Sequence, residues 1–147
     1  FLGYKANMTN IQASLLINQL KNIESFLSKK ETISRKYDKG FKNNKNISKP
    51  SIFPKTKHAR HIYTIWVNPQ KRNYYLDALK NKNIGVAVNF RPIHLMKYYK
   101  EKYGYKKGEF PIAEKIGAST ITIPLYPGLE IDEINFVIET VNRIVTK

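Results

Sequence analysis

The chain has 147 residues, and its 26 Lys and Arg against 11 Asp and Glu give a formal net charge of +15. With 41% hydrophobic residues it can form a core, and the lack of cysteine excludes disulfide scaffolds and thiolate metal sites. Its longest uncharged apolar run, Ile62 to Val67, is far shorter than a bilayer span, and the opening residues do not resemble a signal peptide. A cytoplasmic protein with no membrane partner is therefore expected.

The positive charge permits a nucleic-acid interpretation, because clustered Lys and Arg displace counterions from phosphate backbones. However, residues 1–107 carry a net charge of +18 and residues 108–147 one of −3, and no run forms a basic arm. Most of the basic residues are Lys, which AT-rich coding explains without a partner. A basic nucleic-acid-binding module is kept as an alternative, and no nucleic-acid partner is the expectation.

The first predicted element is a helix of about 30 residues. Thr9 and Gln12 form a capping-box pattern, so the helix should begin near Asn10, and Gly40 is a natural stop. Apolar residues recur three or four positions apart at Ile11, Leu15, Leu16, Leu20, Ile23, Leu27, Ile33 and Tyr37. At about 45 Å the helix would exceed the diameter of a domain of this size, about 38 Å. We therefore expect it to pack on something outside this chain.

A small domain should follow a Lys-, Asn- and Pro-rich connection at 41–57. Apolar runs and periodicities predict, in order, a strand at 62–67, a helix at 72–82, a strand at 86–90, a helix at 94–103, a helix at 111–118, a strand at 119–123 and a final helix. The fold class is α+β: a connecting segment with the long helix at 1–40, then a small domain at 41–147. Its mostly antiparallel sheet should have about three strands flanked by helices.

Asn89 to His94 is the segment richest in binding groups. It places an amide, an aromatic ring, a guanidinium and an imidazole where a strand ends, and the planar fork of Arg91 suits phosphate or carboxylate. The alternative interpretation is that Arg91 is merely solvated and that Phe90 belongs to the core. Spacing alone does not separate these two interpretations.

The remaining histidines and tyrosines have less specific patterns. His58 and His61 lie at a strand entry, where alternate side chains face opposite sides, so hydrogen bonding is favoured over a metal site. Tyrosines interleave with lysines between positions 98 and 105, which permits base stacking but is more typical of a packed amphipathic helix. No nucleophile or general base is evident in the chain.

Six blocks along the chain occur in an order that resembles a known family. They are Leu2–Ala13, His61–Tyr63, Asn83–Val86, Arg91–Leu95 with Tyr98-Tyr99, Phe110–Glu114 and Ile123–Leu129. Together they resemble the DegT/DnrJ/EryC1/StrS family of pyridoxal-phosphate (PLP)-dependent aminotransferases, which act on nucleotide-linked keto-sugars. The resemblance implies a fold-type-I homodimer with a nucleotide-sugar substrate and an amino donor, usually glutamate.

The resemblance also implies that this chain is only a C-terminal portion. In the family, a large N-terminal domain holds the cofactor pocket, the acid that pairs with the pyridine nitrogen, and the aldimine lysine. The string Ser25 to Lys30 fits the family's lysine pattern, but it lies downstream of the 9–13 block and inside the long helix, so we interpret it as coincidence. The fragment is expected to be inactive alone. A non-catalytic regulator or sensor that lost the lysine remains an alternative.

The resemblance implies two sets of contact residues. Lys5 and Asn7 stand where the commoner family pattern has asparagine and arginine, and Lys5 is placed to reach the cofactor phosphate of the partner subunit. Arg91 and His94 resemble sugar-nucleotide contacts at the mouth of the active site, with Phe90 and Tyr98 as packing partners.

Overall fold

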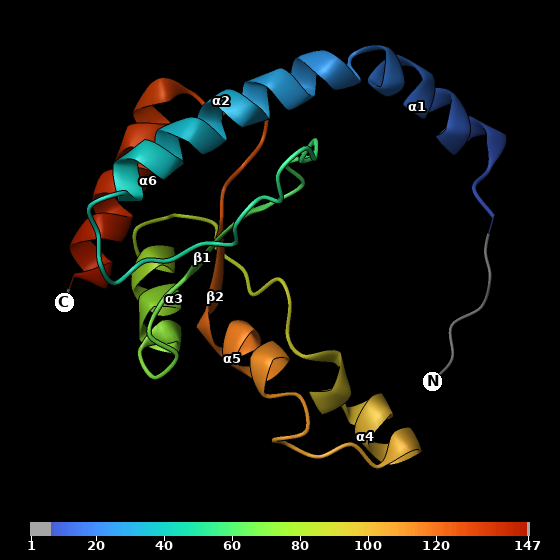
Figure 1. The fold of residues 1–147 in the computed structure, drawn as a ribbon. Helices are drawn as coiled ribbons and strands as arrows, with labels where there is room; N and C mark the ends of the chain where they lie inside the picture. The colour runs from blue at the N-terminus through green and yellow to red at the C-terminus, as the bar shows by residue number, and fades with distance from the viewer. Residues whose placement is uncertain (1–6, 147) are drawn as a thin grey trace.

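The structure is a computed structural model that describes residues 7–146 (Figure 1). In chain order its elements are α1 (Asn10–Lys21), α2 (Ile23–Phe41), β1 (Tyr63–Trp66), α3 (Arg72–Lys80), the 3-10 turn η1 (Ile93–Leu95), α4 (Lys97–Tyr103), α5 (Pro111–Ser119), β2 (Thr120–Ile123) and α6 (Ile131–Val145). The expected α+β class is confirmed. Within the described residues, no helix is both long enough and apolar enough to span a membrane.

The long N-terminal helix begins as predicted but is interrupted. Thr9 Oγ1 accepts the Gln12 N–H at 3.3 Å, and Gln12 Oε1 accepts the Thr9 N–H at 3.0 Å, which is the predicted capping box. The expectation of one continuous helix is wrong, because α1 ends at Lys21, is capped by Asn22 and meets α2 at an angle (Figure 1). The side-chain amide of Asn22 donates to the carbonyl of Asn18 at 2.8 Å and so replaces the backbone bond of a regular helix.

The prediction that Gly40 ends the helix is wrong, because α2 continues to Phe41. A Cβ at position 40 would lie 2.6 Å from Ile138 Cγ2 on α6. The Gly40 carbonyl also accepts the side-chain amide of Asn142 at 3.0 Å. The glycine therefore permits the close approach of α2 to α6.

The strands β1 and β2 pair antiparallel, and one face of the pair carries the core. Tyr63 lies opposite Ile123 and Ile65 opposite Ile121, and all four side chains are buried. On the other face Thr64, Trp66 and Thr122 are partly exposed, and Thr120 is buried. The buried residues of the core face form one hydrophobic cluster with residues of α2, α3 and α6.

The strand expected at 86–90 is wrong, because this segment makes only a single bridge, between Ala87 and Thr122. The next hydrogen-bonded pair on one side would need an N–H from Pro124, which proline lacks. On the other side, the N–H of Thr120 is already bonded to the Ile116 carbonyl at the end of α5. The ladder therefore cannot extend along this segment in either direction.

The core is formed mainly by aliphatic and tyrosine side chains of α2, α3, α6 and the sheet. Its fully buried members include Tyr37, Ile65, Leu79, Ile121 and Val141. The hydroxyl of Tyr37 donates to the Pro124 carbonyl at 2.9 Å, so its polar end is satisfied. Removing the side chain of such an aliphatic residue costs about 2–5 kcal/mol of folding free energy.

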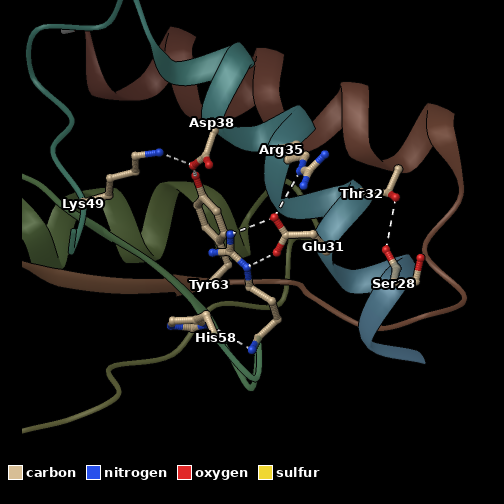
Figure 2. Close-up of polar contacts among 9 residues, drawn as sticks. Ser28, Glu31, Thr32, Arg35, Asp38, Lys49, His58 and Tyr63 are labelled. Atoms are coloured by element: carbon tan, nitrogen blue, oxygen red, sulfur yellow. Dashed lines mark hydrogen bonds and ion pairs between the residues drawn. The ribbon is translucent and has the colours of Figure 1, made fainter. Parts of the chain in front are cut away.

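Three ion pairs join the connection that leads into β1 to α2, and Figure 2 shows the two that involve Glu31 and Asp38. Glu31 accepts from the Arg60 guanidinium at 2.6 and 3.2 Å, and Arg35 also donates to it at 3.1 Å. The hydrogen bond from Arg60 is the main reason that the pKa of Glu31 falls to about 2. Asp38 accepts from the Tyr63 hydroxyl at 2.7 Å and pairs with Lys49.

Candidate functional site

The candidate residues from 90 to 98 lie on one continuous stretch that crosses from the sheet edge through η1 into α4. Phe90 is 67% exposed, so the interpretation of it as a core residue is wrong. Arg91 is also exposed. An apolar ring and a guanidinium therefore face solvent at adjacent positions.

A second guanidinium lies near Arg91, at the first residue of α3. The pKa of Arg72 is lowered first by burial and then by the positive charge of Arg91. The Nε atom of Arg72 is buried, and no described residue accepts a hydrogen bond from it. Two neighbouring cations of this kind favour an anionic ligand, because such a ligand would relieve their mutual repulsion.

His94 differs from its neighbours in being buried and held by a carboxylate. Its Nε2 lies 2.9 Å from Glu114 Oε1, and the two side chains are 8% and 14% exposed. The same Oε1 atom accepts the N–H of Gly108 at 2.7 Å. Phe110 packs against the imidazole at a ring-centre distance of 4.7 Å, and Tyr105 meets it edge-on at 6.4 Å. The imidazole therefore has a fixed orientation.

The tyrosines of this region pack on one another, as their helical spacing favoured. Neighbouring rings in the chain Tyr98, Tyr99, Tyr103, Tyr105 and Phe110 have centres 5.5 to 6.1 Å apart. Lys102 Nζ donates to the Tyr98 hydroxyl at 2.9 Å and lies over two of the rings. These contacts fix α4 and the following loop beside His94.

Helix α5 supports the site from behind by a direct backbone approach. A Cβ at Gly117 would lie 2.5 Å from Pro92 Cδ and 3.3 Å from the Phe90 carbonyl oxygen. Glycine is therefore required for α5 to touch the 90–92 segment. Glu114 and Gly117 are three residues apart and so share one face of the helix.

Of the two residues implied as cofactor contacts, only Asn7 is among the described residues. Asn7 is exposed and precedes the Thr9 cap of α1. Lys5 lies outside the described residues. Their roles therefore stay predictions.

Sequence reasoning missed Glu114 and Gly117 as supports of the site. Glycine inside a helix costs about 1 kcal/mol relative to alanine, which is a signal of close packing. Glu114 gave a weaker signal, because an acid in the first turn of a helix is usually explained by the helix dipole. Among residues 7–146, no group of three or more His, Cys, Asp or Glu side chains is placed to bind a metal.

Comparison with known proteins identifies the family. The model of the DegT/DnrJ/EryC1/StrS aminotransferase family matches residues 1–142. The chain belongs to this family. The resemblance inferred from six sequence blocks is thereby confirmed.

Individual curated proteins match the chain over almost all of its length. The spore coat polysaccharide biosynthesis protein SpsC of Bacillus subtilis is 36% identical over 97% of this chain. A UDP-4-amino-4,6-dideoxy-N-acetyl-β-L-altrosamine transaminase of Campylobacter jejuni is 30% identical over 99%. The chain spans only 38% and 39% of these two relatives, less than half of their length.

A solved structure has the same fold as this chain. The PLP form of Spr1654 from Streptococcus pneumoniae, described as a sugar aminotransferase, superposes with a TM-score of 0.89 at 31% identity. The match covers 97% of this chain and 37% of that one. The fold therefore corresponds to part of a fold-type-I sugar aminotransferase.

Proposed function

We propose that this chain is the C-terminal portion of a PLP-dependent aminotransferase that transfers an amino group to a nucleotide-linked keto-sugar. The observation that supports this most is the site at 90–98, where the charge of exposed Arg91 acts on Arg72 and the fixed imidazole of His94 follows three residues later. Paired guanidiniums suit the diphosphate of a nucleotide sugar. The name of the Campylobacter relative supports the same substrate class.

In the proposed enzyme, bound PLP supplies the chemistry that takes up an amino group from a donor such as glutamate and passes it to a sugar carbonyl carbon. This chain contributes binding and orientation. Arg91 pairs with the anionic part of the nucleotide sugar, and His94 hydrogen-bonds a hydroxyl or amide N–H of the same substrate. Phe90 offers an apolar face at the mouth of the site, and Tyr98 supports α4.

For the cofactor itself, this chain offers phosphate contacts rather than a covalent anchor. The ammonium of Lys5 and the exposed amide of Asn7 are hydrogen-bond donors, which suit phosphate oxygens. Lys30, which holds the lysine position of the string at 25–30, is only partly buried on α2, whereas a Schiff-base lysine needs a desolvated environment. We therefore propose that the PLP-binding lysine lies outside this chain and that the chain alone is inactive.

The proposed assembly is a cytoplasmic homodimer in which Lys5 contacts the cofactor phosphate of the partner subunit. Residues 1–40 would form a connecting segment, and residues 41–147 a small C-terminal domain. Apolar residues along α1 support this arrangement, because Ile11, Leu15 and Leu20 are 78%, 66% and 67% exposed here. Such a stripe is suited to cover another surface.

The proposal is tested by measuring the two half-reactions of the full-length protein separately. Purified protein is supplied with PLP and glutamate, and conversion of the cofactor to its amine form is followed by absorbance. UDP- and GDP-linked 4-amino sugars with 2-oxoglutarate then test the sugar half-reaction in reverse. We expect both half-reactions. Cofactor binding without either half-reaction would favour a regulator or sensor, and binding of neither cofactor nor nucleotide sugar would reject the proposal.

A further inference from the structure

Glu114 joins two parts of the site that are separate in sequence. Its Oε1 atom lies 2.9 Å from His94 Nε2 on η1 and accepts the N–H of Gly108, at 2.7 Å, from the 104–110 loop. Gly108 has φ of 100°, a conformation that favours glycine, so the loop is shaped to aim this N–H at the carboxylate. One carboxylate oxygen therefore holds both the imidazole and the loop.

The chemistry of this contact fixes which nitrogen of His94 carries the proton. The pKa of Glu114 is lowered by its hydrogen bonds, first to His94 and then to Gly108, so the side chain is a carboxylate. A carboxylate only accepts hydrogen bonds, so Nε2 of the imidazole must donate. In the neutral ring, Nδ1 is then left with a lone pair and acts as an acceptor.

The ring cannot easily turn to exchange its two nitrogens. Phe110 and Tyr105 pack against it, and both lie in or next to the loop that Glu114 holds. On the same face of α5, Gly117 lets the helix touch Pro92, two residues before His94. The helix therefore sets both the position of the 90–92 segment and the orientation of the imidazole.

We propose that Glu114 is a positioning residue that holds His94 with Nε2 as the donor, so that Nδ1 accepts a hydrogen bond from the nucleotide sugar. This inference rests on the proposed function. The group recognised is a hydroxyl or amide N–H of the substrate, because a neutral imidazole nitrogen with a free lone pair accepts from such donors. Glu114 itself does not touch the substrate.

A double-mutant cycle in the full-length enzyme tests whether Glu114 acts through His94. Glu114→Ala and His94→Ala should each raise the KM for the nucleotide amino sugar about tenfold, and the double variant should be no worse than His94→Ala. Glu114→Gln should stay near wild type, because its amide oxygen can accept from both donors. The glutamate half-reaction should be unchanged in all four proteins. The proposal would be overturned if the KM increases of Glu114→Ala and His94→Ala multiply in the double variant. It would also be overturned if the variants lose the glutamate half-reaction to the same extent as the sugar half-reaction.

A second measurement does not depend on turnover or on Glu114→Ala folding. ¹⁵N-histidine NMR of the full-length protein near pH 8 reports the protonated nitrogen, and the His94 signal is assigned by its loss in a His94 variant. We expect a proton on Nε2 only, in the wild type and in Glu114→Gln. A proton on Nδ1, or on both nitrogens, would overturn the inference. If the wild type shows neither half-reaction, the proposed function is rejected. The NMR measurement still reports which nitrogen of His94 is protonated.

Discussion

At the scale of single residues, charged side chains act in pairs with different purposes. Arg60 is nearly buried and satisfied by Glu31, so this pair fastens the chain before β1 to α2. Arg91 is exposed, its charge lowers the pKa of Arg72, and no ion pair joins it to a carboxylate within residues 7–146. The first arrangement stabilises the fold, and the second leaves positive charge available for a ligand.

The Glu31 pair predicts an acid-dependent loss of stability. The pKa of Glu31 is about 2 in the folded chain against an ordinary value of 4.5, so its contribution is complete above pH 4.5 and disappears toward pH 2. We expect about 1–2 kcal/mol, because solvent screens this partly exposed pair. Urea unfolding of the 147-residue chain and of Glu31→Gln should differ at pH 6 and converge near pH 2. A difference that does not depend on pH would contradict the assignment.

At the scale of elements, α5 determines the position of the segment that carries Arg91 and His94. It has few core residues of its own, but its Gly117 face touches the 90–92 segment and its Glu114 holds His94. The carbonyl of Ile116 in α5 also accepts the N–H of Thr120. This bond stops the 86–90 segment from pairing further with β2. The candidate site is thus a loop held by a helix rather than the end of a regular strand.

Gly117→Ala tests this role of α5. The new methyl group would overlap Pro92, so we expect a loss of about 1–3 kcal/mol in stability and a severalfold higher KM for the nucleotide sugar in the full-length enzyme. Gly85→Ala is the matched control, because no atom lies within 4 Å of its added Cβ and its φ is not positive. Thermal unfolding and steady-state kinetics measure both effects. Equal behaviour of the two variants would show that α5 does not position the segment.

At the scale of the whole molecule, sequence reasoning succeeded where the signal is local. The Thr9 cap, the buried faces of α3 and α6, and the strands around Ile65 and Ile121 follow from short-range periodicity. The lost third strand could not be predicted in this way, because it depends on Pro124 and on a bond between Thr120 and Ile116. The break at Asn22 depends on one side-chain amide competing with the backbone.

The sequence predicted which residues face the ligand in the candidate site, but not which residues hold them in place. Arg91 and His94 were found from their residue types at a strand end and from the family resemblance. Their supports, Glu114 and Gly117, lie about 20 residues downstream, and only the folded chain brings them behind the site. Long-range packing of this kind leaves no periodic trace in a single sequence.

The proposed dimer predicts complementation between two inactive variants of the full-length enzyme. One variant carries Lys5→Ala and the other lacks the cofactor-binding lysine. If Lys5 reaches the partner's site, a mixed dimer regains one intact site, so unfolding and refolding the two together should restore activity, up to about one site in four by random pairing. Each variant refolded alone is the control. Mixed dimers with no recovered activity would reject the cross-subunit contact.

The most direct test of the central claim compares the two half-reactions in full-length wild type and Arg91→Ala. If this chain supplies the nucleotide-sugar site while the cofactor is held mainly elsewhere, the variant should bind PLP and react with glutamate normally. Its KM for the nucleotide amino sugar should rise about tenfold or more, because a charge-assisted contact is lost. An unchanged KM for the sugar, or an equal loss in both half-reactions, would contradict the account.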